Sequence, residues 1–151
     1  MRIISQWPAA IARIKGNGSN SGLRGVVRFY QFAGGVMVEA DITGLPNNGA
    51  GFHGFHIHSG AACKEDDFST TGGHLDLAGR PHPLHTGDLP PLLSRNGRAY
   101  LAVLTDRFSI SDIAGRTVVI HQGADDFHSQ PAGNAGEKIA CGVIQRCQNK
   151  M

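Results

Sequence analysis

Histidines in the middle of this sequence have the spacing of metal ligands. If residues 54–58 form a strand, His56 and His58 point to one face while Phe55 and Ile57 point to the other, because side chains alternate along a strand. Two imidazoles on one strand face can chelate a single ion, and the apolar pair can anchor the strand in a core. Taken alone, the pair is a weak signal, and its alternative interpretation is two exposed or capping histidines.

Further ligand types follow downstream. His82, His85 and Asp88 fall within seven residues, and His74 precedes them. Neutral imidazoles with a carboxylate and no thiolate suit zinc in tetrahedral geometry and also suit copper. His121 ends a run of β-branched residues, where a side chain can leave a sheet and enter a site. Six histidines and one aspartate are too many for one tetrahedral ion and match two ions that share a ligand.

Short strands and long loops must position these residues. Strands are expected at 7–15, 25–32, 36–42, 51–58, 88–93, 98–105, 115–121 and 138–145. The clearest, 36–42, alternates apolar and polar side chains, and the weakest, 88–93, contains two prolines and is expected at a sheet edge. No segment has a helical stripe, so the chain is expected to be all-β. The stretch 59–87 is too long for an ordinary connection and is interpreted as a functional loop.

The whole chain sets further limits. Its 151 residues, with no repeat or linker, are expected to form one domain over 1–151. The net charge is +2 and basic residues do not cluster in the sequence, so neither nucleic acid nor a membrane is expected as a partner. Residues 1–14 lack a continuous apolar core, so the sequence as written is expected to be cytoplasmic. A leader removed beforehand would instead allow secretion or the cell envelope.

Six segments, spread over roughly residues 22–145, follow one another in the order of a known family. They are 54–58, 73–74, 85–88, 115–121, 124–126 and 133–144. Together they resemble the successive signature segments of copper/zinc superoxide dismutases, in their bacterial type. The resemblance implies an all-β fold, an eight-stranded Greek-key β-barrel or sandwich, with both metals held outside the barrel by two long loops.

The resemblance also implies roles for the candidate ligands. The implied copper ligands are His56, His58, His74 and His121. The implied zinc ligands are His74, His82, His85 and Asp88, so that His74 bridges the two metals. Asp125 would accept a hydrogen bond from one histidine of each metal and fix the orientation of both rings. The alternative is that Asp125 is an ordinary loop aspartate.

Three cysteines permit one disulfide and one free thiol. By resemblance to the family, Cys63 pairs with Cys141 and ties the first long loop to the last strand, while Cys147 stays free. The alternative is that Cys63 and Cys141 are two buried thiols in a reducing cytoplasm.

Lys138 departs from the family pattern. Relatives usually carry arginine at this position, where it docks the superoxide anion beside copper. Lysine keeps the charge but lacks the planar fork of donors, so steering of the anion is expected to survive and its orientation to weaken. Lys138 could instead be a solvated lysine at a strand end. The loop at 58–63, which builds the dimer interface of eukaryotic relatives, is short here, so a monomer and a homodimer are both open.

These observations favour an oxidoreductase that converts superoxide to dioxygen and hydrogen peroxide. Copper would cycle between two oxidation states, zinc would be structural, His74 would carry a proton and Lys138 would supply positive potential. Hydrolysis by zinc is disfavoured because no glutamate general base accompanies the histidines. The alternative function is a copper/zinc storage or chaperone protein that has the same fold and little turnover.

Overall fold

The computed structural model describes residues 7–148, and within that range the regular secondary structure is almost entirely β-strand, joined by turns and long loops. Its strands are β1 (Ala10–Gly16), β2 (Arg24–Phe32), β3 (Gly35–Thr43), β4 (Phe52–His53), β5 (Phe55–His58), β6 (Leu92–Leu93), β7 (Ala99–Thr105), β8 (Thr117–His121) and β9 (Lys138–Arg146). Helical turns are limited to η1 (Gly18–Asn20), η2 (Ser69–Thr71) and α1 (Ile110–Ile113). The expected all-β class is therefore confirmed.

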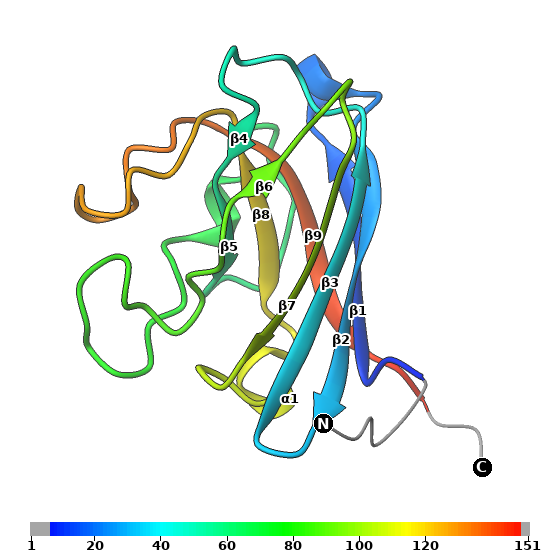
Figure 1. Ribbon diagram of the computed structural model, residues 1–151, viewed down its shortest axis with the longest axis vertical. Helices are drawn as coiled ribbons and strands as arrows, with labels where there is room; N and C mark the ends of the chain where they lie inside the picture. The colour runs from blue at the N-terminus through cyan, green and yellow to red at the C-terminus, as the bar shows by residue number, and fades with distance from the viewer. Residues whose placement is uncertain (1–6, 149–151) are drawn as a thin grey trace.

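Seven of the strands form one antiparallel sheet in the order β5-β8-β9-β1-β2-β3-β7. The sheet curls on itself, and the two-stranded sheet β4–β6 lies at its open side (Figure 1). In the described part of the chain, no helix is long and apolar enough to cross a membrane.

The structure has nine strands in its described part, against the eight implied by the resemblance, because the expected strand 51–58 divides at Gly54. The N–H of Gly54 donates to Gly123 O at 2.8 Å, and its carbonyl accepts from the N–H of His121 at 2.9 Å. A Cβ on Gly54 would lie 2.8 Å from the Cβ of Ala135, so glycine allows this close approach. At this residue the chain leaves its partner β6 and joins β8.

The expected strand 88–93 shrinks to Leu92–Leu93. Pro90 and Pro91 have no N–H to donate, so pairing starts only after them. The resulting strand β6 is one of the two members of the small sheet, which agrees with its expected weakness.

The core lies inside the curled sheet and follows the alternation of the strands. Inward positions of β2 and β3 bury Val27, Phe29, Val36 and Val38, and these pack in one cluster with side chains from β1, β8 and β9. His53 is also fully buried, and its Nδ1 lies 3.0 Å from His121 O.

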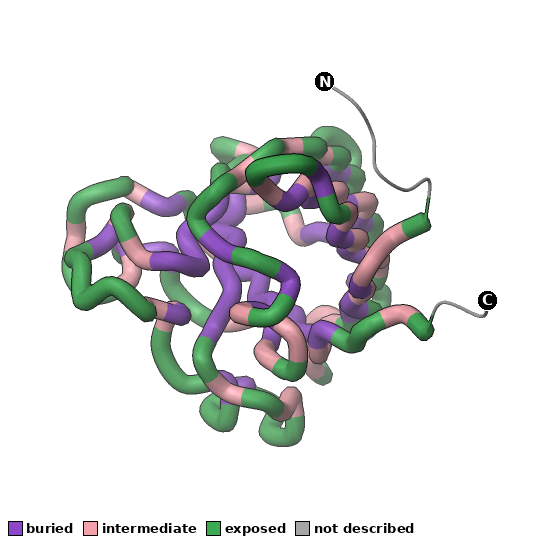
Figure 2. The backbone as a smooth tube through the Cα atoms, turned by 90° about the horizontal axis from the view of Figure 1, so that it is seen from below, coloured by how far each residue is buried: buried purple, intermediate pink, exposed green. Residues whose placement is uncertain are grey.

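Two long connections, the first between β5 and β6 and the second between β8 and β9, cover the outer face of β5 and β8. Both strands are buried at every position, although only one of their faces points into the barrel. The first connection pairs with the free edge of β5: Leu75 donates its N–H to Ile57 O at 2.8 Å, and Ile57 donates to Gly87 O at 2.9 Å. Figure 2 shows buried stretches of the backbone in the interior of the molecule, with exposed loops around them. The connections thus hold the downstream histidines against β5.

Candidate metal centre

The structure brings the predicted ligands together in two groups that share one histidine. The first, here called the four-histidine group, consists of His56, His58, His74 and His121. The second, here called the carboxylate group, consists of His74, His82, His85 and Asp88. In each group the candidate ligand atoms all lie within 4.8 Å of one another.

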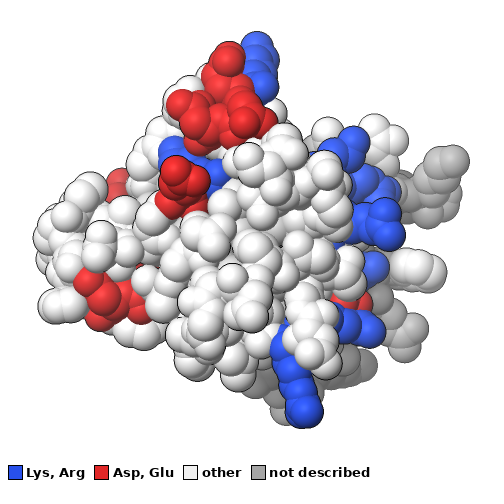
Figure 3. Space-filling view, turned by 90° about the horizontal axis from the view of Figure 1, so that it is seen from above, with Lys and Arg blue, Asp and Glu red and all other residues white. Residues whose placement is uncertain are grey.

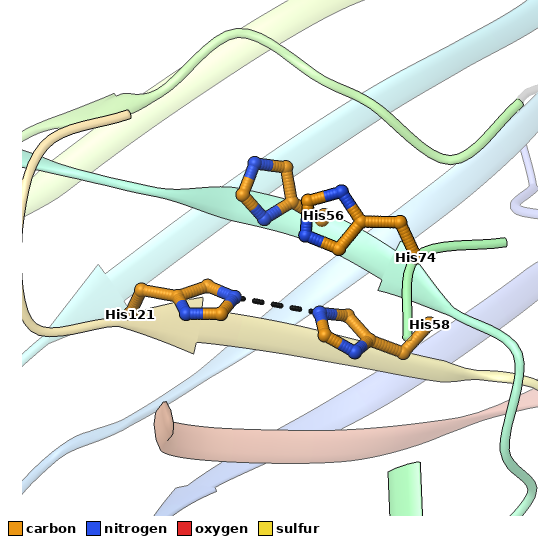
Figure 4. A group of neighbouring side chains, drawn as sticks. All are labelled: His56, His58, His74 and His121. Carbon is orange, nitrogen blue, oxygen red and sulfur yellow. Dashed lines mark hydrogen bonds between the residues drawn. The ribbon is translucent and has the colours of Figure 1, made fainter. Parts of the chain in front are cut away.

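Strands β5 and β8 place three members of the four-histidine group. His56 and His58 leave the outer face of β5, while Phe55 and Ile57 enter the core, so the predicted alternation is confirmed. His121 lies at the end of β8, where a register shift after Ile120 turns the side chain out of the ladder. The Nε2 atoms of His121 and His58 are 3.4 Å apart, and the rings of all four histidines converge (Figure 4).

Backbone carbonyls orient two of these rings. His58 Nδ1 lies 2.8 Å from Gly72 O, and His121 Nδ1 lies 3.1 Å from Gly136 O. A carbonyl only accepts, so in each ring Nδ1 carries the proton and Nε2 keeps a free lone pair. Both free lone pairs belong to the atoms that face each other across the group.

The carboxylate group has the spacing of a tetrahedral metal site. His74 Nδ1 is 2.7 Å from Asp88 Oδ1 and 3.4 Å from His85 Nδ1. His82 Nδ1 is 3.0 Å from Asp88 Oδ2. A tetrahedral zinc ion with bonds of about 2.0–2.1 Å separates its ligand atoms by about 3.3 Å. The donor atoms therefore surround a volume of the right size for one ion.

Asp125 joins the two groups. Its Oδ2 accepts from His56 Nε2 at 2.7 Å, and its Oδ1 accepts from His82 Nε2 at 2.8 Å. The N–H of Phe127 also donates to Oδ1 at 2.7 Å. These bonds turn the Nδ1 atoms of His56 and His82 toward their groups, the geometry expected of a carboxylate that orients metal ligands.

Three ring nitrogens in these groups are buried without a hydrogen-bond partner: His56 Nδ1, His74 Nε2 and His82 Nδ1. A buried, unpaired polar atom costs free energy, and one metal ion in each group would satisfy all three. His82 Nδ1 is close to Asp88, but not in hydrogen-bonding geometry. His53 Nε2 is unpaired as well and lies in neither group. The donor set thus fits one ion in each group.

The protonation states also suit metal binding. Burial lowers the pKa of His58 to about 2 and that of His121 to about 3, so both rings are neutral at pH 7. Burial opposes ionisation of Asp125, but hydrogen bonds from His56 and His82 outweigh it and hold its pKa at about 2. Burial also opposes ionisation of Asp88, but the hydrogen bond from His74 and the charges of the neighbouring histidines together outweigh it and lower the pKa of Asp88. Neutral imidazoles and ionised carboxylates are the forms that bind metals.

Lys138 lies beside the four-histidine group. It is paired with His121 across β8 and β9, and its Nζ donates to Thr71 Oγ1 at 2.8 Å and to Gly72 O at 2.9 Å. Gly72 O is also the acceptor for His58. Lys138 is therefore hydrogen-bonded beside a candidate ligand, and its side chain is partly buried. Burial lowers its pKa, and the charge of Asp67 opposes that shift.

Two residues near the groups could not be recognised from sequence motifs. Arg107 follows β7 and donates from Nη1 to Pro83 O at 2.8 Å, with the carbonyl oxygens of His85 and Asp88 at 3.4 Å. Gly133 lies against Asp125, and a Cβ there would overlap Asp125 Oδ1 and come within 2.6 Å of His82 Nε2. The only sequence signal for Gly133 is its place at the start of the segment 133–144.

The predicted disulfide is present. Cys63 and Cys141 are bonded with a Cα–Cα distance of 5.9 Å, and Cys147 is free. The bridge packs against Phe68 and Val119, so it fastens the first long connection to the outer side of the sheet.

A curled β-barrel that carries two donor groups joined through one histidine is the kind of scaffold that can hold two metal ions side by side. The family described as "Copper/zinc superoxide dismutase (SODC)" matches residues 23–144. The chain therefore belongs to the copper/zinc superoxide dismutase family, as its motifs predicted. Copper and zinc are its cofactors, and the two groups supply suitable ligands for both.

Individual relatives support this assignment. A Cu-Zn superoxide dismutase of Legionella pneumophila is 37% identical over 131 residues, which is 80% of this chain and 77% of that protein. A copper chaperone for superoxide dismutase of Rattus norvegicus is 32% identical over 152 residues, which is 91% of this chain and 53% of that protein. A double mutant of a SOD-like protein from Bacillus subtilis has a TM-score of 0.80 and 25% identity, with 93% of this chain and 99% of that chain covered.

Proposed function

We propose that this protein is a superoxide dismutase, in which two superoxide anions and two protons give one dioxygen and one hydrogen peroxide. The observation that carries the proposal is that His74 belongs to both donor groups, with its Nδ1 beside Asp88 and His85 and its Nε2 buried without a hydrogen-bond partner. A storage site has no need of a ligand shared between two ions. A redox site does, because the shared ring can hold a proton on one side while the other side stays bound.

The ligands divide between the metals according to their chemistry. His56 Nδ1 and the Nε2 atoms of His58, His74 and His121 would hold copper, since this group consists of imidazoles only. The Nδ1 atoms of His74, His82 and His85 would hold zinc together with the carboxylate of Asp88. When bound, copper would supply a one-electron couple and zinc a fixed positive charge.

The protein's own residues supply proton handling and orientation. His74 Nε2 is buried without a hydrogen-bond partner, so it can take a proton when it is not a ligand and give it to the reduced substrate. His74 Nδ1 remains at 2.7 Å from Asp88, which keeps the ring in place during that transfer. Asp125 holds His56 and His82 at the same time and fixes both groups relative to each other.

Lys138 would attract the substrate anion. Its ammonium group lies next to the acceptor of His58, so a positive charge adjoins the four-histidine group. On the face shown in Figure 3, lysine and arginine side chains form small separate groups, and several of these lie beside aspartate or glutamate side chains. A single charge close to the reacting position then matters more than a broad surface potential.

A copper-handling protein with little turnover is the second candidate. It is supported by the similarity to the rat copper chaperone and by lysine at position 138. The shared histidine favours the dismutase, because metal transfer does not require it.

The two functions are separated by measuring metal content and superoxide decay on the same sample. After loading with copper and zinc, elemental analysis should find one of each per chain, and pulse radiolysis should show catalytic decay of superoxide. His121→Ala should lose copper and activity, while His128→Ala, which changes an exposed histidine outside both groups, should keep both. Full copper loading with no catalysed decay would contradict the proposal and favour the copper-handling function.

A further inference from the structure

We propose that Thr71 is a positioning residue whose hydroxyl fixes the ammonium group of Lys138 beside the four-histidine group and so sets the affinity of this site for small anions. The inference rests on the proposed function for its substrate, because superoxide is the anion in question. The arrangement of hydrogen bonds that supports it can be tested without turnover.

Three acceptors surround the ammonium group. Lys138 Nζ donates to Thr71 Oγ1 at 2.8 Å, to Gly72 O at 2.9 Å and to Phe68 O at 3.5 Å. A lysine ammonium has three donors, so these contacts account for all of them. The shortest contact is the one to Thr71, and it is the contact made by a side chain.

Thr71 is itself held in one orientation. Its side chain is completely buried, and its hydroxyl donates to Phe68 O at 2.7 Å. Because that proton is committed to Phe68, the oxygen can only accept from Lys138. The hydroxyl is therefore a fixed acceptor and not a mobile partner.

The position held by Thr71 places the charge where anions would bind. Gly72 O accepts from both Lys138 and His58, so the ammonium is one shared atom away from a candidate copper ligand. Lys138 also lies opposite His121 across β8 and β9. Its charge contributes to the lowered pKa of both histidines, which agrees with this proximity.

Lysine needs such a fixed acceptor more than arginine would. Its ammonium is a compact charge on a flexible four-carbon chain, whereas a guanidinium presents a rigid fork of donors. Asp67 is an exposed carboxylate whose charge acts on Lys138. An ammonium released from Thr71 would therefore move toward Asp67 and solvent, which would weaken the attraction at the four-histidine group.

The test compares the parent with Thr71→Val, Thr71→Ser and Thr70→Val. Valine keeps the size of threonine and removes the hydroxyl, and serine restores it. Thr70 is the matched control, because it lies in the same turn, is exposed, and donates to Ala62 O without contacting Lys138. Two quantities are measured: azide affinity of the copper- and zinc-loaded protein from its visible spectrum, and the acetylation rate of each lysine in the metal-free protein by mass spectrometry.

In Thr71→Val we expect azide affinity to fall roughly two- to fivefold, as when one charge moves a few ångström away in a partly exposed site. Acetylation of Lys138 should become faster while Lys15 and Lys64 react as before. Thr71→Ser and Thr70→Val should behave like the parent. Unchanged azide affinity and unchanged Lys138 acetylation in Thr71→Val would overturn the inference, and so would equal losses in the valine and serine variants, which indicate a role in packing alone.

A further check needs no variant. In the parent protein Lys138 must be acetylated more slowly than the exposed Lys15 and Lys64, and equal rates would overturn the inference even if Thr71→Val does not fold. Failure of the proposed function can be distinguished from failure of this inference. Azide binding that depends on Thr71, in a protein that does not consume superoxide, would support the inference and contradict the dismutase activity.

Discussion

Lys138 and His58 donate hydrogen bonds to the same atom, the carbonyl oxygen of Gly72, at 2.9 and 2.8 Å. One peptide unit thus fixes both the proton position on a candidate copper ligand and the charge expected to attract its substrate. A carbonyl has two lone pairs, so it can serve both donors without competition.

The charge of Lys138 should control the salt dependence of the superoxide reaction. Lys138→Ala should lower the rate constant and flatten its dependence on ionic strength, because the attraction that salt screens has been removed. Lys138→Arg should raise the rate constant, because the guanidinium keeps the charge and offers a preformed fork of donors. The measurement is superoxide decay against salt concentration at matched copper occupancy.

Lys15→Ala is the control for that comparison, since Lys15 is exposed on β1 and makes none of the contacts of Lys138. If Lys138→Ala is as fast and as sensitive to salt as the parent, Lys138 does not guide the substrate.

Acid should destabilise the metal-free protein. The pKa of His58 is lowered from 6.5 to about 2, and that of His121 from 6.5 to about 3, chiefly by burial. The unfolded chain therefore takes up these protons near pH 6.5, and the folded chain only far below it. The stability contributed by the neutral rings is fully present above that pH and falls on acidification, by at most about 1.4 kcal/mol per pH unit for each ring.

Denaturant unfolding between pH 7.5 and 4 measures this effect. Replacing one ring by a residue that does not titrate, as in His121→Asn, should make the free energy of unfolding depend less steeply on pH. The decrease in slope should correspond to about one proton. A free energy of unfolding that is constant over this range in the parent would show that the folded and unfolded chains take up equal numbers of protons, which contradicts the lowered pKa values of the buried rings.

Gly133→Ala should weaken zinc binding. The added Cβ would overlap Asp125 Oδ1 and crowd His82 Nε2, so the hydrogen bond between them must open. Loss of such an orienting contact typically lowers metal affinity about 10- to 100-fold. Competition with a chromophoric zinc chelator measures the change.

Gly136→Ala is the matched control for Gly133→Ala. Both glycines have positive φ, 73° and 79°, but nothing lies within 4 Å of a Cβ at Gly136. Equal losses of zinc affinity in both variants would indicate that backbone strain, and not the contact with Asp125, weakens zinc binding in Gly133→Ala.

Arg107→Ala should speed the release of zinc. Arg107 donates to three backbone carbonyls of the loop that carries His85 and Asp88, so its removal loosens that loop. We expect release to be roughly tenfold faster, the effect of losing one charge-assisted hydrogen bond. Arg98→Ala removes an exposed arginine that pairs with Asp41 elsewhere, and it should release zinc at the parent rate. Equal rates in the parent and Arg107→Ala would exclude the anchoring role.

The sequence was sufficient to predict the placement of side chains whose residue type indicates their chemistry. Alternation in residues 54–58 correctly separated His56 and His58 from the core pair Phe55 and Ile57, because strand geometry leaves no other arrangement. The expected strand positions also agree with the structure to within a few residues, except where Pro90 and Pro91 shorten β6.

Contacts that use backbone atoms could not be predicted in this way. Arg107 donates to backbone carbonyl oxygens, and a backbone carbonyl oxygen orients the hydroxyl of Thr71. Every residue has such an oxygen, so no residue pattern marks these partners. Gly133 is needed because a larger side chain would collide with its neighbours, and Gly54 lies where the chain changes its strand partner. Such relations depend on how distant segments meet, and only the folded chain shows them.

The carboxylate of Asp125 has a consequence for how the protein acquires its metals. Because one side chain holds a ring from each group, an ion bound in either group restricts a ligand of the other before that ligand is used. Binding of the first ion therefore already orders part of the second site, and binding of the second ion loses less conformational entropy. Chains with both sites filled should be more abundant than independent binding would give, and chains carrying a single ion correspondingly scarce.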